Sequence, residues 1–134
     1  MLNLTSVSDI SGVIYDLSVK QGKTYQLSFN YPADLTQGEI RGQIRDKYAQ
    51  DNGVLLAEFG FNVSWDSVEL KSLVVAKLDP SVTTDIPYTK FQGTGDTTTR
   101  NCYVYDIEYE ENETVLLLLN GLVEVKPEVT VEVM

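Results

Sequence analysis

The chain has 134 residues, a formal net charge of −10 and a single cysteine, Cys102. This length is sufficient for one domain with its own core, so residues 1–134 are expected to form a single domain, and one cysteine excludes an internal disulfide. The acidic balance argues against nucleic acid and anionic membranes as partners, and no segment approaches the roughly 18 apolar residues of a membrane-spanning helix.

Apolar and polar residues alternate with a period of two through the first half of the chain, which predicts β-strands. The expected strands are residues 14–19, 24–31, 40–45, 55–65 and 68–75. Gly22 provides a turn after the first strand, Pro32 ends the second, and Asn52-Gly53 forms part of a turn before the fourth. Gly60 lies in the middle of a predicted strand, where we expect a bulge or a bend.

Two segments of the second half differ from this pattern. Residues 78–87 lack strand character, and Asp79 followed by Pro80 is a suitable start for a single helical turn. Residues 90–101 are polar and contain glycine, so they are expected to form a loop long enough to serve as a contact.

The stretch CYVYDIEYE, residues 102–110, places tyrosines on one strand face and carboxylates on the other. It is predicted to form a hairpin with residues 115–125 across Glu111-Asn112-Glu113, with a bulge at Asn120-Gly121. The tyrosine face is expected to line the core and the carboxylate face to be solvated. Four residues on the apolar sides of strands are predicted to be buried in the core: Phe59, Trp65, Tyr105 and Leu117.

Short strands joined by frequent turns, without a long helix, predict an all-β fold: a single antiparallel β-sandwich of about seven to eight strands. Residues 1–12 and 128–134 fall outside the sandwich pattern and are expected to be terminal arms that pair with partner proteins. The predicted interface consists of positions on these arms and around the loop at 90–101: Leu2, Leu4, Tyr88, Phe91, Thr94, Arg100, Val129, Val131 and Val133.

No group of residues predicts catalysis. The chain has no histidine to activate Cys102 or a serine. The carboxylates Asp106, Glu108 and Glu110 follow one strand instead of facing each other across a cleft, although a weak calcium site there is an alternative. We therefore predict a protein that is not an enzyme and has no catalytic, cofactor-binding or metal-ligating residues.

An ordered set of short motifs extends from about residue 14 to residue 130. The motifs are QG at 21–22, DLT at 34–36, RGQIR at 41–45, YVYDIE at 103–108 and GLVEVKPEVT at 121–130. This set resembles a group of small proteins encoded among the virion structural genes of tailed bacteriophages. The chain departs from the usual pattern in having Tyr31-Pro32-Ala33 in place of a glycine-containing turn, and in its longer loop at 90–101.

The resemblance implies an immunoglobulin-like or jelly-roll-like β-sandwich that acts as a structural protein of the virion. On this basis we expect a tail, baseplate or neck adaptor that joins other virion proteins or anchors fibres. It would be made in the host cytoplasm and assembled in several copies. The alternatives are a capsid decoration protein and a carbohydrate- or receptor-binding module, which would expose aromatic side chains together on one concave face.

Overall fold

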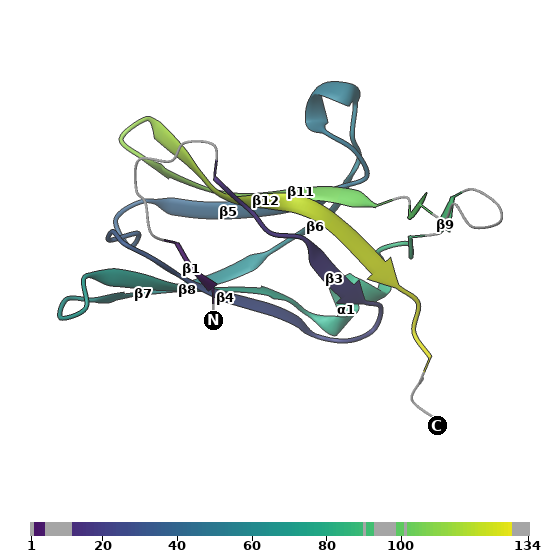
Figure 1. Ribbon diagram of the computed structural model, residues 1–134, viewed down its shortest axis with the longest axis horizontal. Coiled ribbons are helices and arrows are strands. Elements are labelled where there is room, and N and C mark those ends of the chain that lie inside the picture. The colour runs from purple at the N-terminus through teal and green to yellow at the C-terminus, as the bar shows by residue number, and fades with distance from the viewer. Residues whose placement is uncertain (1, 5–11, 90, 93–98, 101, 130–134) are drawn as a thin grey trace.

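Two β-sheets pack face to face in the computed structural model, which describes residues 2–4, 12–89, 91–92, 99–100 and 102–129 (Figure 1). The strands are β1 (Leu2–Asn3), β2 (Val13–Ile14), β3 (Leu17–Lys20), β4 (Tyr25–Tyr31), β5 (Glu39–Arg45), β6 (Leu55–Glu58), β7 (Gly60–Asp66), β8 (Lys71–Leu78), β9 (Phe91–Gln92), β10 (Thr99–Arg100), β11 (Tyr103–Glu111) and β12 (Thr114–Lys126). Two short helical segments, η1 (Ala49–Asp51) and α1 (Pro80–Thr84), lie in the connections. The prediction of an all-β sandwich is confirmed.

The order of the strands identifies the kind of sandwich. One sheet has the order β1-β4-β8-β7, and the other has the order β2-β12-β11-β5-β6, with β3 also beside β12. Numbered along the chain, these are the A-B-E-D and G-F-C orders of immunoglobulin-like domains. This likeness concerns the strand order alone, and it matches one of the two expected sandwich types.

The sequence predicted antiparallel sheets, but some of the strand pairs are parallel. β1 runs parallel to β4, and both β2 and β3 run parallel to β12. The predicted first strand is broken at Tyr15-Asp16, where the chain crosses close to Gly121. A Cβ atom added to Gly121 would lie 2.7 Å from the carbonyl oxygen of Tyr15, so this approach requires glycine.

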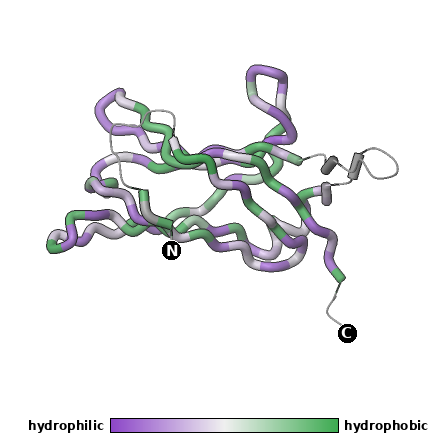
Figure 2. The backbone as a smooth tube through the Cα atoms, viewed as in Figure 1, coloured by the Kyte–Doolittle hydropathy of each residue, from purple (hydrophilic) through white to green (hydrophobic). Residues whose placement is uncertain are grey.

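The core lies between the inward faces of the two sheets, as the alternation of apolar residues predicts. Its fully buried side chains include Phe29, Ile44, Val74, Ile107 and Val123, which come from both sheets. Tyr105 and Tyr109 are buried beside Ile107, which confirms that the tyrosine face of β11 lines the core. Hydrophilic residues gather instead in the projecting loop between β5 and β6 (Figure 2).

The pairing of β11 with β12 contains a bulge at Leu118, and not at Asn120-Gly121 as predicted. Ile107 is opposite Leu119 whereas Glu108 is opposite Leu117, so Leu118 is the extra residue. Leu118 and Leu119 are both buried, and Leu117 is moved to the outer face, where it is only half-buried. The prediction that Leu117 lies in the core is therefore wrong, because the bulge reverses the alternation.

The predicted strand at 55–65 is two strands in different sheets. The chain leaves β6 at Glu58, crosses between the sheets at Phe59 and enters β7 at Gly60, so the expected bend is present. Phe59 is buried, as predicted. Trp65 is only half-buried, and its assignment to the core is wrong because β7 is an edge strand with no neighbour on one side among the described residues.

Local turns follow the sequence closely. Gly22 adopts a φ of 75°, and the hairpin between β11 and β12 turns on Asn112 and Glu113, with φ values of 50° and 67°. α1 begins at Pro80 after Asp79, as expected, although the Asp79 side chain makes no capping hydrogen bond.

Candidate functional site

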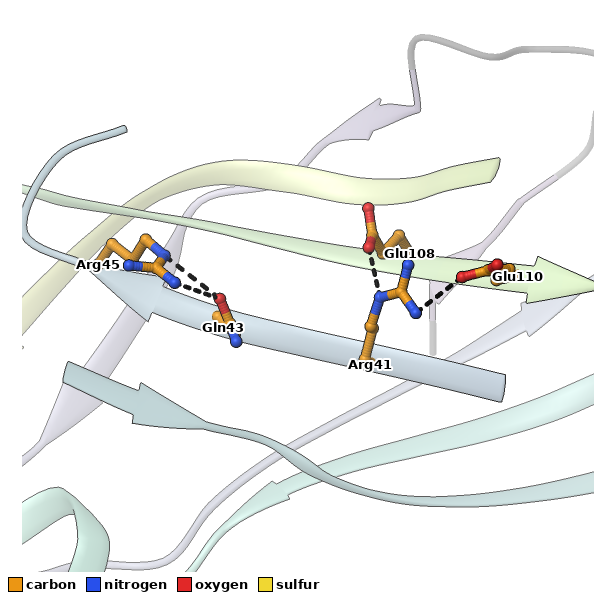
Figure 3. Close-up of polar contacts among 5 residues, drawn as sticks. All are labelled: Arg41, Gln43, Arg45, Glu108 and Glu110. Atoms are coloured by element: carbon orange, nitrogen blue, oxygen red, sulfur yellow. Dashed lines mark hydrogen bonds and ion pairs between the residues drawn. The ribbon is translucent and has the colours of Figure 1, made fainter. Parts of the chain in front are cut away.

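The outer face of β5 and β11 carries a group of charged side chains. The register places Arg41 opposite Glu108, and Glu110 follows two residues later on the same face. The Nε atom of Arg41 lies 2.5 Å from Oε1 of Glu108, and its Nη1 atom lies 2.9 Å from Oε1 of Glu110 (Figure 3). Hydrogen bonds to Glu108 and then Glu110 raise the pKa of Arg41, so the guanidinium stays charged between the two carboxylates.

This arrangement corrects the prediction that the carboxylates of β11 form a simple solvated face. Glu108 and Glu110 are half-buried and held by Arg41, whereas Asp106 is exposed. The guanidinium forms an ion pair with each of the two glutamates. Within the described ranges, no group of three or more Asp, Glu, Cys or His side chains could hold a metal ion.

A second arginine fixes the loop between β5 and β6. Arg45 donates two hydrogen bonds to Oε1 of Gln43, at 3.2 and 3.0 Å (Figure 3). It donates a third to the carbonyl oxygen of Gly53 at 2.9 Å. Asp46 accepts a hydrogen bond from the backbone N–H of Val54 at 2.7 Å. These bonds connect both ends of the loop, which projects from the sandwich (Figure 1).

A groove lies between this loop and the outer face of the sheet, with a volume of about 370 Å³. Its lining includes Arg41, Tyr48, Val104, Asp106 and Leu117. Tyr48 is 61% exposed at the rim. Partial burial in the groove is the main cause that raises the pKa of Asp106, and repulsion from Glu108 raises it further. The Asp106 side chain nevertheless reaches solvent. The lining is mixed polar and apolar, which suits contact with a protein segment.

The sequence analysis did not find this groove. Its wall is the loop at 46–54, whose position above β11 and β12 depends on the fold and is not visible in the sequence. Leu117 faces the groove only because of the bulge at Leu118. The available signal was the alternation along β5, which turns Arg41, Gln43 and Arg45 away from the buried Gly42 and Ile44.

Four of the predicted interface residues lie towards the end of the sandwich from which β9 and the end of β12 extend (Figure 1). Tyr88 is 45% exposed and Val129 is 93% exposed. Phe91 in β9 pairs with Arg100 in β10.

Thr89 fixes this end of the molecule. Its backbone N–H donates to the carbonyl oxygen of Val125 at 2.9 Å, and its Oγ1 atom accepts from the N–H of Val125 at 3.0 Å. Both residues are buried. This anchor holds the neighbouring Tyr88 beside the end of β12.

Within the predicted N-terminal arm, residues 2–4 lie against the sandwich instead of extending from it. Leu2 pairs with Phe29 in the sheet, Leu4 is buried, and the N–H of Leu4 donates to the carbonyl oxygen of Asn30 at 2.9 Å. The edge of β4 accepts residues 2–4 as a short parallel strand, so the prediction that Leu2 and Leu4 are presented to partners is wrong. Thr94, Val131 and Val133 lie outside the described residues.

No protein-family model matches the chain, and no curated protein sequence matches it at a significant level. None of the helices in the described part of the chain is both long enough and apolar enough to cross a membrane.

Proposed function

We propose that the protein is a non-enzymatic structural component of a tailed-bacteriophage virion, acting as a tail, baseplate or neck adaptor. The observation that carries this proposal is the position of the resembling motifs in the fold. Gln21 of the QG motif donates to the carbonyl oxygen of Ile86 at 2.8 Å, and Leu35 of the DLT motif is buried with its N–H 2.9 Å from Oγ of Ser72. These residues stabilise the connections between strands.

The motifs in the second half of the chain also lie where two segments of the fold meet. Tyr103 of YVYDIE donates from its hydroxyl to the carbonyl oxygen of Pro87 at 2.8 Å, which ties the start of β11 to the preceding connection. Gly121 permits the close crossing at Tyr15. Since the motifs that carry the resemblance are those that stabilise this sandwich, they favour a scaffold like that of the phage proteins. Contact residues on such a scaffold can vary from protein to protein.

An adaptor needs exposed apolar surface that a neighbouring subunit can cover. Three exposed side chains provide such surface around the otherwise hydrophilic β5–β6 loop: Tyr48, Val54 and Leu55 are 61%, 60% and 41% exposed. Val129 provides a second exposed apolar position after β12. We propose that the adaptor binds other virion proteins through these regions, in several copies per particle.

A carbohydrate-binding module is the alternative from another class. It would need aromatic side chains grouped on one face. Exposed tyrosines are separated in this fold: Tyr15 lies between β2 and β3, Tyr48 in the β5–β6 loop and Tyr88 after α1. In the part of the chain that the structure describes, these tyrosines form no shared platform, which favours the adaptor.

The test is incorporation into purified particles. We expect the protein to co-sediment with phage particles and to be labelled by immunogold at the tail or neck. A chain lacking residues 129–134 should keep a nearly unchanged Tm but be incorporated less. The control is Val115→Ser, which removes another exposed apolar side chain, 48% exposed, from the opposite end of β12.

Two results would change the conclusion. Uniform labelling of the capsid would make the protein a decoration protein. A full-length protein that stays in the soluble lysate and never co-sediments with particles would refute a virion role.

A further inference from the structure

The edge of the four-stranded sheet at β7 lacks a neighbour within the described residues. β7 pairs with β8 on one side, and no described strand lies on its other side. Its sequence, GFNVSWD, contains no lysine or proline, and its first charged residue is Asp66 at the very end. An edge of this kind exposes alternate N–H and C=O groups that can pair with another strand.

The other edges are partly covered, shorter or irregular: β1 pairs with Phe29 and Asn30 at the edge of β4. β6 has four residues and a register shift in its pairing with β5, and β3 has four residues and ends at Lys20. β7 has seven residues and no shift in its pairing with β8. Its inward side chains Phe61, Val63 and Trp65 are only half-buried, so a further strand would cover them.

We propose that β7 is a self-association surface, at which two copies of this chain pair their β7 strands in antiparallel orientation around a two-fold axis at Val63. In this register Phe61 is opposite the partner's Trp65, and Asn62 is opposite the partner's Ser64. The first pair joins aromatic side chains on the inner face, and the second joins small polar side chains on the outer face, both favourable combinations across strands. Two four-stranded sheets would become one continuous sheet.

Charges on the outer face agree with this register. Gly60 is opposite Lys77 of β8, and Asp66 is opposite Lys71. Pairing at Val63 brings the partner's Asp66 opposite Gly60, one strand away from Lys77. A Cβ atom at Gly60 would have only one neighbour, at 3.9 Å, so the space above Gly60 is open. Lys77, whose Nζ atom lies 3.6 Å from Oδ1 of the exposed Asp79, would cross this space and exchange Asp79 for the partner's Asp66. Each end of the interface would then hold an aspartate between two lysines.

The turns at the ends of β7 add a second complementary feature. The turn after Asp66 exposes Val68 and Leu70, which are 86% and 64% exposed. At the opposite end of β7, a surface cavity of about 480 Å³ is lined in part by Gly60, Phe61 and Val82. An antiparallel pair brings the exposed turn of each copy beside the cavity end of the other. The inference stands independently of a virion role, because it depends on this edge alone.

The experiment compares two double variants by sedimentation equilibrium over a series of protein concentrations. Asn62→Lys/Ser64→Lys places two like-charge pairs across the interface, whereas Asn62→Lys/Ser64→Glu places two opposite-charge pairs there. Both positions are exposed, so the isolated fold should keep its Tm. We expect the dissociation constant of the lysine–lysine variant to exceed that of the lysine–glutamate variant by about tenfold or more.

Lys77→Glu is an independent variant, because it repels the partner's Asp66 without changing β7, and it should also weaken association. High salt should weaken the wild-type dimer for the same reason. A wild-type chain that remains monomeric at millimolar concentration would refute the proposal. Equal association of the two double variants would refute it as well, since residues 62 and 64 would not face each other.

Discussion

Replacing Tyr105 with alanine tests the assignment of the two faces of β11. Tyr105 is 4% exposed and lies in the core, whereas the next residue, Asp106, is exposed on the groove side. Substituting each with alanine therefore changes opposite faces of one strand at adjacent positions. The two free energies of unfolding should differ greatly if the observed register is correct.

The expected magnitude follows from the contacts of Tyr105. Its ring meets that of Phe59 edge to face, with centroids 6.2 Å apart, and its hydroxyl donates a hydrogen bond to the carbonyl oxygen of Tyr15. Truncating a buried aromatic side chain to alanine costs about 3–5 kcal/mol. Tyr105→Phe removes only the hydroxyl and should cost about 1 kcal/mol. Asp106→Ala should cost less than about 0.5 kcal/mol, because its side chain is exposed.

The assay is urea unfolding followed by circular dichroism, with wild type and all three variants at one pH. We expect the order of destabilisation to be Tyr105→Ala, then Tyr105→Phe, then Asp106→Ala, with similar m values. If Asp106→Ala were as destabilising as Tyr105→Ala, the assignment of the inner and outer faces would be refuted.

Three further predictions concern a glycine, an aspartate and a tyrosine. Gly121→Ala should destabilise by about 1–3 kcal/mol in urea unfolding, because its Cβ would lie 2.7 Å from a backbone oxygen, whereas the control Gly60→Ala should be nearly neutral. Hydrogen bonds hold the pKa of Asp34 below 3.8, so wild-type stability should fall as the pH drops through that region, and Asp34→Asn should reduce this dependence in acid titrations. Burial raises the pKa of Tyr25 to about 12, so stability should fall as the pH rises above 10, and Tyr25→Phe should lessen the loss measured by alkaline titration.

Local features of this protein are predictable from its sequence. The period of two predicts nearly all the long strands and the inward direction of Tyr105 and Ile107, because a strand turns alternate side chains to one face. The positive φ values at Gly22 and Asn112, and the helical turn at Pro80, depend on residues next to one another in the chain.

Features that depend on which strands meet required the tertiary structure. Trp65 has the alternation of a core residue, yet β7 lies at an edge, and a sequence pattern carries no information on the missing neighbour. Leu117 is turned outward by a bulge that appears only when β12 pairs with β11. Leu2 and Leu4 enter the sheet because the edge of β4 is open to them.

The candidate site divides in the same way. That Arg41 and Arg45 face outward is local, and the sequence determined it. The tertiary structure decided that Arg41 meets Glu108, which is 67 residues away in the sequence. It also decided that the loop carrying Tyr48 forms a wall beside them. The physical reason is that alternation specifies the face of a strand, whereas the partners of that face are chosen by the packing of the whole chain.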